Sequence, residues 1–239
     1  MRIAELFYSI QGEGKLIGVP SVFVRSSGCN LRCVWCDTPY ASWEPQGDDW
    51  SVDRIVDAAE TLVRTQLTAN PAFCRYVVLT GGEPMMMPDI VDLAREFHQA
   101  NWHITIETAG TIYKDLPVDL VSISPKLSNS TPWQKDEGRF AAVHERNRIK
   151  TSVIQDLMDL AKDFQLKFVV SDPKDLSEID SLLKQLQGWN PSDVLLMPEG
   201  TDVETLRSRQ GWIGEVCKQT GFRYSPRLHV ELYGNQRGT

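Results

Sequence analysis

The sequence predicts an α/β fold built on a mostly parallel sheet. Several short apolar runs are rich in Val, Ile and Phe and end at turn or polar residues, as β-strands do. Amphipathic helical patterns lie between several of these runs, and repeated strand–helix units build parallel sheets with helices packed outside. The runs are too apolar for a sheet with one solvated face, which again favours a parallel sheet.

Seven runs are predicted as strands. They cover residues 21–25, 76–80, 103–108, 119–124, 166–170, 193–198 and 228–232. Three amphipathic patterns are predicted as helices, at residues 52–63, 88–97 and 175–186. In the first helix, Ile55, Ala59 and Leu62 form one apolar stripe. Ser51 is placed to cap the N-terminus of that helix.

Two polar segments interrupt this alternation. Residues 43–50 are predicted as a loop, and residues 125–150, which contain two prolines, as a loop or lid. No linker separates the remaining elements, so residues 1–239 are expected to form a single domain.

Composition and charge narrow the class of protein. The chain has 239 residues, of which 41% are hydrophobic and 24% charged, as in ordinary globular proteins. Its net charge of −7 argues against nucleic acid as a partner, because nucleic acid binds large basic surfaces. The N-terminus lacks the apolar stretch of a signal peptide, and no run is long enough to span a bilayer. We therefore expect a cytoplasmic protein without nucleic-acid or membrane partners, whose clustered cysteines serve a metal or catalysis rather than disulfides.

Three of the five cysteines fall in the segment G-C-N-L-R-C-V-W-C-D-T, residues 28–38, which we name the cysteine loop. Cys29, Cys33 and Cys36 have the spacing C-x3-C-x2-C. A structural zinc site needs four ligands, and the other two cysteines stand alone, so no second half-site is visible. Three buried cysteines without a metal are a further alternative. Three thiolates also suit a [4Fe–4S] cluster whose fourth iron is left for a small chelating molecule.

The spacing of these cysteines, with the aromatic Trp35, resembles the signature of radical S-adenosylmethionine (SAM) enzymes. The resemblance implies an abridged, partial radical SAM β/α barrel with mostly parallel strands. It also implies a [4Fe–4S] cluster on the three thiolates and SAM on the open iron. The residues that it places at SAM are Trp35, Gly82, Glu83, Glu107, Ser124, Pro125, Lys126 and Lys167. Most of them end predicted strands, where barrel enzymes collect their chemistry, although T-G-G-E-P (80–84) could also be an ordinary strand–helix turn.

Further motifs resemble the 7-carboxy-7-deazaguanine synthase family. They are Y-S-I-Q-G-E-G, F-V-R-S-S-G-C-N, C-x-W-C-D-T, L-T-G-G-E-P, S-P-K and the C-terminal P-R-L-H-V-E-L-Y-G-N-Q-R-G-T. The resemblance implies a lyase-type conversion of 6-carboxy-5,6,7,8-tetrahydropterin to 7-carboxy-7-deazaguanine and ammonia, which feeds 7-deazapurines such as the queuosine of tRNA. It also implies Mg²⁺, a homodimer, and an electron donor such as flavodoxin or ferredoxin.

This second resemblance assigns the remaining site residues. Thr38 is the expected Mg²⁺ ligand, and the residues expected at the substrate are Ile10, Gln11, Gly12, Glu13, Arg25, Thr80, His229 and Thr239. Plain alternatives exist for three of these positions. Arg25 could form a structural ion pair, Glu13 could lie at the surface of a turn, and Thr38 could cap a backbone group.

The sequence leaves two rival functions open. A glycyl-radical-enzyme activase would share the cysteines and the G-G-E motif but would not need Q-G-E-G and Arg25 arranged for a small carboxylated ligand. A zinc-stabilised binding module would be colourless, whereas an iron–sulfur protein is brown.

Overall fold

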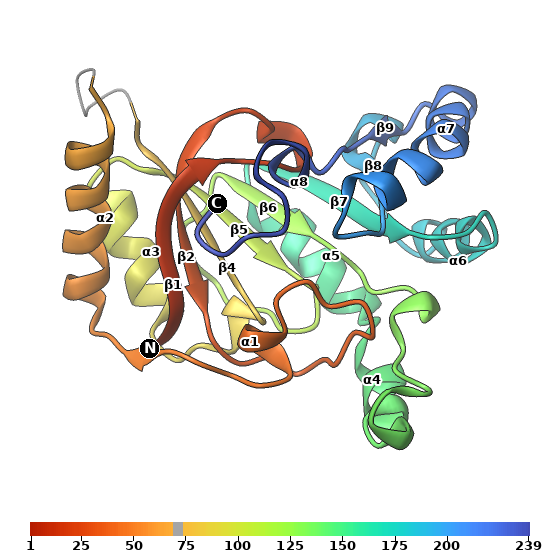
Figure 1. Ribbon diagram of the computed structural model, residues 1–239, viewed down its shortest axis with the longest axis horizontal. Helices are drawn as coiled ribbons and strands as arrows, with labels where there is room; N and C mark the ends of the chain where they lie inside the picture. Colours follow the sequence, from red (N-terminus) through yellow and green to blue (C-terminus); the bar gives the residue numbers. More distant parts are fainter. Residues whose placement is uncertain (69–73) are drawn as a thin grey trace.

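The computed structural model describes residues 1–68 and 74–239 (Figure 1). A nine-stranded sheet, in the order β3-β1-β2-β4-β5-β6-β7-β8-β9, runs through these residues. The strands are β1 (Arg2–Ile10), β2 (Pro20–Ser26), β3 (Asp48–Asp49), β4 (Tyr76–Gly81), β5 (His103–Thr108), β6 (Leu120–Ile123), β7 (Asp163–Val170), β8 (Val194–Pro198) and β9 (Arg223–Tyr224). β1 is antiparallel to β2 and β3, and every later pair is parallel. The predicted mostly parallel sheet is confirmed.

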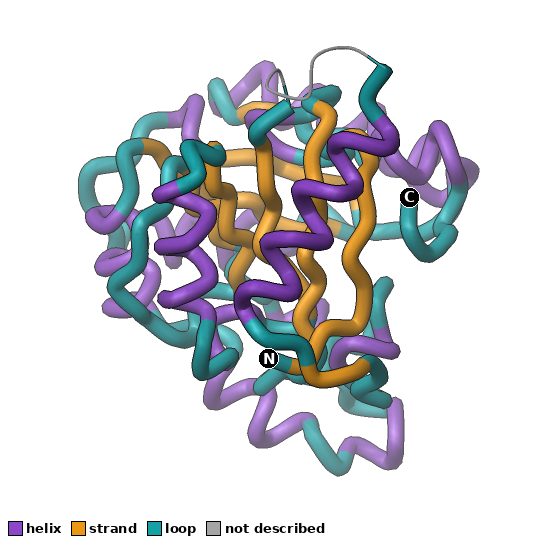
Figure 2. Tube along the Cα trace, turned by 90° about the vertical axis from the view of Figure 1, so that its left-hand side faces the viewer, coloured by secondary structure: helices purple, strands orange, loops and turns teal. Residues whose placement is uncertain are grey.

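The longer helices cover one face of the sheet. The helices are α1 (Pro39–Ser42), α2 (Val52–Gln66), α3 (Ile90–Gln99), α4 (Ala141–Asn147), α5 (Thr151–Leu160), α6 (Asp175–Leu183), α7 (Val203–Thr220) and α8 (Leu228–Tyr233). α2 packs on β1 and β2, α5 on β6 and β7, and α7 on β8, and Figure 2 shows α2 in front of the strands. Ser51 caps α2 as predicted, since its hydroxyl accepts a hydrogen bond from Arg54 N at 3.3 Å. None of the described helices is both long and apolar enough to cross a membrane.

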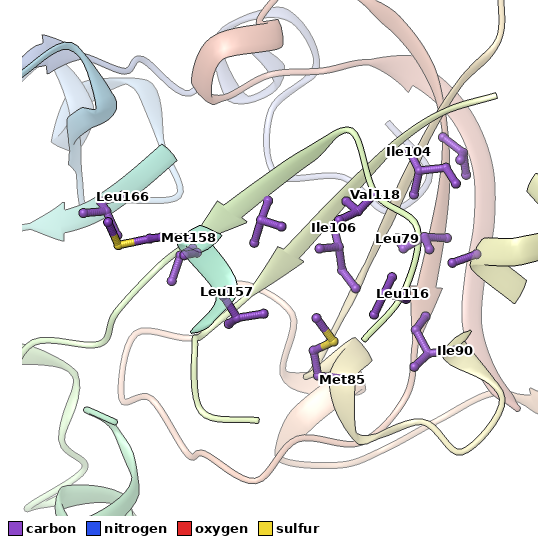
Figure 3. Packing of buried hydrophobic residues seen from close by; sticks show 14 of the residues in the cluster. Leu79, Met85, Ile90, Ile104, Ile106, Leu116, Val118, Leu157, Met158 and Leu166 are labelled. Carbon is purple, nitrogen blue, oxygen red and sulfur yellow. The ribbon is translucent and has the colours of Figure 1, made fainter. Parts of the chain in front are cut away.

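The strand side chains divide between two environments. Leu79 of β4 and Ile106 of β5 belong to the main apolar core beneath the helices (Figure 3). Their sequence neighbours Thr80 and Glu107 lie on the opposite side of the sheet, because successive residues of a strand point to opposite faces. The strands are thus apolar towards the helices and partly polar towards a cavity on the other face.

The prediction of a strand at residues 228–232 is wrong, because this segment is helix α8. β9 already occupies the sheet edge beside β8, and the chain then turns back towards the β1–β2 connection. There Leu228 N donates to Gly12 O at 2.9 Å. Away from any strand partner, a helical turn satisfies the local backbone groups and buries Val230.

Among the longer elements, three are absent from the sequence prediction, namely β1, α5 and α7. β1 mixes polar and apolar residues more evenly than the buried strands do, and α7 contains Gly211 and Gly214, which lower its helix propensity. α5 begins directly after the polar segment that was expected to be loop. Residues 43–50 are a loop as predicted, except that β3 at their end pairs with β1.

The segment predicted as a loop or lid, residues 125–150, contains helix α4 and is attached to the cysteine loop. Ser130 O accepts a hydrogen bond from Val34 N at 2.8 Å. Asn129 O accepts another from the indole N–H of Trp35 at 3.1 Å. Because these bonds hold the two segments together, the segment acts as a support for the cysteine loop rather than as a free lid.

Candidate active site

A cavity of about 440 Å³ lies on the polar side of the sheet, at the carboxyl ends of the parallel strands. The predicted site residues that line it are Ile10, Gln11, Gly12, Glu13, Arg25, Cys29, Cys33, Trp35, Cys36, Thr38, Thr80, Gly82, Glu107, Ser124, Lys126, Lys167, His229 and Thr239. From the predicted set, Glu83 and Pro125 do not line it. The fold therefore gathers residues from both ends and the middle of the sequence around one space.

The strands present a polar row to this cavity. Arg25 of β2 lies opposite Thr80 of β4, and Glu107 of β5 lies opposite Ser122 of β6. Thr80 Oγ1 donates to Glu107 Oε2 at 3.0 Å, and Gln11 Nε2 donates to Glu107 Oε1 at 3.2 Å. The row is held by its own hydrogen bonds, so its side chains are positioned before any ligand binds.

Arg25 forms the structural ion pair that was one of its two interpretations, and it also lines the cavity. Its Nε donates to Glu5 Oε2 at 3.0 Å, so the structural ion pair exists. Tyr40 Oη also donates to Glu5 Oε2, at 2.9 Å, which fixes the carboxylate. The two terminal amino groups of Arg25 have no hydrogen-bond partner among the described residues, and Arg25 lines the cavity. These groups form the flat pair of donors that binds a carboxylate in a bidentate manner.

Cys29, Cys33 and Cys36 lie together at the cavity wall. They pack with Leu31 and Ala109 in a small apolar cluster. Burial raises the pKa of Cys29 and of Cys33 to about 12, so these sulfurs become thiolates only where a metal supplies positive charge. Three soft ligands from one loop, beside an open cavity, fit a [4Fe–4S] cluster.

Glu83 lies beneath the cavity and anchors its floor. Its buried carboxylate accepts hydrogen bonds from Thr108 Oγ1 and from Ala109 N, both at 2.8 Å. Burial raises the pKa of Glu83, and these donors oppose the shift. A Cβ on the preceding Gly82 would lie 2.2 Å from Gly28 O, so glycine is needed for the turn to pack against the cysteine loop. The G-G-E turn therefore joins the cysteine loop to β4 and β5.

A buried histidine supports the cysteine loop from behind. His144 Nδ1 accepts a hydrogen bond from Arg32 N at 3.1 Å, and His144 Nε2 lies 2.9 Å from Ser130 Oγ. Ser130 Oγ donates its own proton to Leu127 O at 2.6 Å. This network assigns the neutral ring with its proton on Nε2. Burial lowers the pKa of His144 to about 4, which agrees with a neutral ring.

Glu13 is largely buried, so the alternative of a surface glutamate is wrong. Its carboxylate pairs with Lys167 and with Arg227 Nε, the latter at 3.1 Å, and His229 Nε2 lies 4.0 Å away. Burial alone would raise the pKa of Glu13, but the Lys167 and Arg227 cations lower it well below its usual range. Burial would lower the pKa of Lys167, but Glu13 raises it. Lys167 therefore lies beside Glu13, one of the residues expected at the substrate.

His229 and Gly12 meet where the C-terminal segment crosses the cavity. A Cβ on Gly12 would lie 2.1 Å from His229 Nδ1, so the approach requires glycine. Burial lowers the pKa of His229 although the Glu13 carboxylate opposes the shift, so the ring is neutral at neutral pH. Thr239 and the residues before it, 235–238, also line the cavity.

Lys126 brings positive charge to the cysteine side of the cavity. Its Nζ donates to Ser124 Oγ at 2.8 Å and to Ser124 O at 2.7 Å. Burial raises the pKa of Cys29 and Cys33, and the Lys126 ammonium opposes this shift for both thiols. Pro125 lies between Ser124 and Lys126 in sequence, but it is buried and does not line the cavity.

Arg227 and Asp37 are site residues that sequence reasoning did not assign. Arg227 is buried and pairs with both Asp37 and Glu13. Burial would raise the pKa of Asp37, but Arg227 lowers it. Asp37 directly precedes Thr38, so this ion pair holds the segment next to the expected Mg²⁺ ligand. Because residues 228–232 were predicted as a strand, the sequence did not indicate the turn before α8 that brings Arg227 to the cavity.

Comparisons with known proteins cover most of the chain. The family model described as Radical SAM superfamily matches residues 23–172. The 7-carboxy-7-deazaguanine synthase of Halobacterium salinarum is 45% identical over 242 residues, which cover 98% of this chain and 90% of that protein. The 7-carboxy-7-deazaguanine synthase of Rhodopirellula baltica is 42% identical over 237 residues, which cover 99% of this chain and 88% of that protein.

A solved structure gives the same result for the fold. The crystal structure of QueE from Escherichia coli has a TM-score of 0.68 and 26% sequence identity to this chain, covering 95% of this chain and 94% of that one. The expected radical SAM-like partial barrel is therefore confirmed. Because sequence and structure agree over nearly the whole length, the chain belongs to the 7-carboxy-7-deazaguanine synthase family of the radical SAM superfamily.

Proposed function

We propose that this chain converts 6-carboxy-5,6,7,8-tetrahydropterin to 7-carboxy-7-deazaguanine and ammonia in the cavity described above. One observation carries the proposal: nearly all residues that the family resemblance assigns to the cluster, to SAM and to the substrate converge on this one cavity. The family acts in queuosine biosynthesis. Family membership leaves no support for the activase or for the zinc-stabilised module.

The cysteine side of the cavity would hold the cofactors. Cys29, Cys33 and Cys36 would ligate the [4Fe–4S] cluster, with Trp35 and Lys126 among the residues along SAM. When bound, the cluster and SAM would supply the radical chemistry needed to activate a C–H bond of the pterin. The protein positions the reacting groups and excludes water, while the cofactor carries the difficult step.

The opposite side of the cavity suits a carboxylated pterin. The free amino groups of Arg25 would pair with the substrate carboxylate. Glu13 stays ionised, and two of its roughly four lone-pair sites remain to accept N–H groups of the guanine-like ring edge. Gln11 and Thr80, already fixed on Glu107, would add amide and hydroxyl contacts. The neutral His229 ring can donate or accept a hydrogen bond without adding charge.

Thr38 would contribute the protein oxygen for Mg²⁺. Its hydroxyl lines the cavity, 3.8 Å from Cys36 Sγ. Mg²⁺ prefers oxygen ligands and usually takes several of them from water and substrate. One hydroxyl oxygen from the protein is therefore enough. The bound cation would hold the substrate carboxylate and offset charge that develops during rearrangement.

The family resemblance also supports four wider features of the proposal. We infer that the chain works as a single domain over residues 1–239, as a homodimer, and in the cytoplasm. It would receive electrons from a donor such as flavodoxin or ferredoxin. A supporting point is that the described residues share one sheet and one main core.

The direct test is product formation by the anaerobically purified enzyme with a rebuilt cluster. SAM, dithionite, Mg²⁺ and 6-carboxytetrahydropterin are added, and mass spectrometry follows 7-carboxy-7-deazaguanine. The expected result is many product molecules for each SAM consumed. A brown protein that cleaves SAM without forming this product would overturn the substrate assignment.

Two cysteine variants separate the cluster from general effects of losing a thiol. Cys33→Ala should form neither 5′-deoxyadenosine nor product, because one cluster ligand is gone. Cys217→Ala, at a buried cysteine of α7 outside the cavity, should keep both activities. Deoxyadenosine formation by Cys33→Ala would contradict the assignment of the cluster to the cysteine loop.

A further inference from the structure

A buried serine lies beside one of the three cysteine sulfurs. Ser42 ends α1 and is 3% exposed, and its hydroxyl oxygen lies 3.1 Å from Cys36 Sγ. The Thr38 hydroxyl is farther from the same sulfur, at 3.8 Å. The proposed function uses Cys36 as a cluster ligand but gives Ser42 no role. A hydroxyl at this distance from a sulfur that would hold iron is placed to act on the cluster through that sulfur.

The hydroxyl proton of Ser42 has two acceptors within reach among the described residues. Cys36 Sγ lies at 3.1 Å and Thr38 O at 3.4 Å. Thr38 O already accepts a hydrogen bond from Ala41 N at 2.9 Å, so one of its two lone pairs is used. A cysteine that ligates iron is a thiolate, which has no proton to give and is a charged acceptor. The Ser42 proton is therefore directed at Cys36 Sγ when that sulfur is ionised.

Two neighbouring hydrogen bonds fix Ser42 at this sulfur. Ala41 O accepts a hydrogen bond from Gly28 N at 2.8 Å. Trp43 Nε1 donates to Cys33 O at 3.0 Å. The residues on either side of Ser42 are thus bonded to the cysteine loop, so the hydroxyl is held in place before a cluster binds.

The other two cysteine sulfurs have different surroundings. Cys29 Sγ accepts a hydrogen bond from Leu31 N at 3.4 Å, and that backbone donor does not depend on any side chain. Within residues 1–68 and 74–239, no hydrogen bond reaches Cys33 Sγ. In this part of the chain, the Ser42 hydroxyl is therefore the closest side-chain donor to a sulfur of the cysteine loop.

We infer that the Ser42 hydroxyl donates a hydrogen bond to the cluster-ligating sulfur of Cys36 and thereby sets the reduction potential of the cluster. The inference rests on the proposed function, because it needs a cluster on the cysteine loop. Reduction adds one electron to the cluster, and part of this negative charge lies on the sulfurs. A hydrogen-bond donor on a sulfur stabilises the reduced cluster more than the oxidised one, so it raises the potential. Ser42 therefore makes the cluster easier to reduce, and reduction precedes the cleavage of SAM.

The test compares variants that differ in the hydroxyl. Ser42→Ala removes the donor from the buried position. Ser42→Thr and Ser42→Val form a second pair, because threonine and valine have nearly the same shape and only threonine carries a hydroxyl. Ser27→Ala is the matched control. Ser27 is also a buried serine, two residues before Cys29, and its hydroxyl has no hydrogen-bond partner among the described residues.

The measurement is the midpoint potential of the rebuilt cluster in each protein. A dithionite titration without SAM, Mg²⁺ or substrate is followed by electron paramagnetic resonance of the reduced cluster. We expect a lower potential in Ser42→Ala than in wild type, and a lower potential in Ser42→Val than in Ser42→Thr. At the wild-type midpoint, the ratio of reduced to oxidised cluster in Ser42→Ala should fall about ten-fold, which corresponds to about 59 mV for a one-electron couple. Ser27→Ala should keep the wild-type potential.

The contrary results are distinct. Equal potentials in wild type and Ser42→Ala, or in Ser42→Thr and Ser42→Val, would overturn the inference. An equally lowered potential in Ser27→Ala would assign the effect to packing of the loop and would also overturn it. If no Ser42 variant holds a cluster, Ser42 is needed for the shape of the site rather than for its potential, and the inference is wrong. A wild-type protein that binds no cluster would contradict the proposed function and the inference together, whereas equal potentials in loaded proteins contradict the inference alone.

Discussion

At the scale of single residues, Arg227 links the β1–β2 connection to the cysteine loop. It pairs with Glu13, which is expected at the substrate, and with Asp37, which precedes the expected Mg²⁺ ligand. It also donates to Gly200 O at 2.5 Å. Breaking a buried ion pair leaves an uncompensated charge, which costs several kcal/mol. Arg227 is therefore a positioning residue, and its loss should displace both Glu13 and the segment that carries Asp37.

We expect Arg227→Met to lower kcat/KM about 10–100-fold, since Glu13 and Asp37 lose a shared cation. The pH dependence gives a more specific readout. Arg227 contributes to the lowered pKa of Glu13, so its removal raises that pKa. An acid limb of the kcat/KM profile that follows ionisation of Glu13 should therefore move to higher pH. Arg95→Met, which breaks an exposed pair with Asp92, is the control and should leave the profile unchanged.

A second residue-scale prediction concerns the neutral ring of His144. His144→Phe keeps a ring of similar size but removes the bonds to Arg32 N and Ser130 Oγ. We expect the free energy of unfolding at neutral pH to fall by about 2 kcal/mol. The pKa of His144 is about 4 in the folded protein and 6.5 ordinarily, so the folded state resists protonation. Wild type therefore loses this stabilisation as the pH falls from 6.5 towards 4.

Urea unfolding of wild type and of His144→Phe between pH 6.5 and 4 tests the direction of this change in stability. The stability difference between wild type and His144→Phe should shrink towards the acid end, because only wild type loses stability from this ring. His98→Phe, at an exposed histidine of α3, should show no such trend. A difference that stays constant with pH would mean that the pKa of His144 is the same in the folded and the unfolded protein, which would contradict the assignment of a neutral ring held by burial.

At the scale of elements, the segment around η4 (Ser128–Ser130) links the cysteine loop to the sheet. Asn129 O accepts from the Trp35 indole at 3.1 Å. Asn129 Nδ2 donates to Val169 O at 3.1 Å and to Asp175 Oδ2 at 2.9 Å. One short turn thus connects the loop that carries the cysteines with β7 and α6. Groups that orient metal ligands in this way commonly change metal affinity 10–100-fold when removed.

We expect Asn129→Ala to shorten the lifetime of the rebuilt cluster about ten-fold in the presence of an iron chelator. The brown absorbance of the cluster gives the rate without any activity assay. Asn147→Ala is the matched control, because its side chain makes no hydrogen bond in the part of the chain that the structure describes. Equal rates of cluster loss in the two variants would show that the Asn129 links do not hold the cysteine loop.

The elements also show how far the sequence predicts this fold. Buried parallel strands such as residues 76–80 and 103–108 are recognisable because their composition depends only on local burial. The inward-facing Thr80 and Glu107 follow from the same two-residue period. α8 could not be recognised this way, because L-H-V-E-L alternates like a strand while its position beyond the sheet edge makes it a helix. Tertiary position overrides local pattern there.

Site residues divide along the same line. The cysteines and Gly82 are predictable because their spacing and backbone requirements are local. Arg227 and His144 act on segments far from them in sequence, on Glu13 and Arg32 respectively, so only the folded chain reveals their role. Glu83 was found by its motif, but its buried position beneath the cavity depends on Thr108 and so on the register of β5.

At the scale of the whole molecule, the connection between β1 and β2 spans the open side of the sheet. β1 and β7 are separated in the sheet by β2, β4, β5 and β6. η1 (Gly14–Leu16) nevertheless contacts β7, because Lys15 Nζ donates to Asp163 Oδ1 and to Phe164 O, both at 2.6 Å. Lys15 Nζ also donates to Asp193 Oδ1 at 3.0 Å. This tie holds Gln11 and Glu13, which precede it, over the cavity.

We expect Lys15→Met to lower the free energy of unfolding by about 2 kcal/mol, because a largely buried cation with two carboxylate partners is lost. Burial alone would raise the pKa of Asp193, but Lys15 lowers it, so this stabilisation is complete above the ordinary value of 3.8 and disappears as the pH falls below it. The substrate KM should rise several-fold, since the β1–β2 connection is no longer fixed over the cavity. Lys184→Met, which breaks an exposed pair with Asp180, should change stability by less than about 0.5 kcal/mol and leave KM unaltered. Equal unfolding free energies and equal KM values for Lys15→Met and Lys184→Met would contradict this prediction. They would mean that the backbone alone holds the β1–β2 connection over the cavity and that the Lys15 ion pairs are not needed.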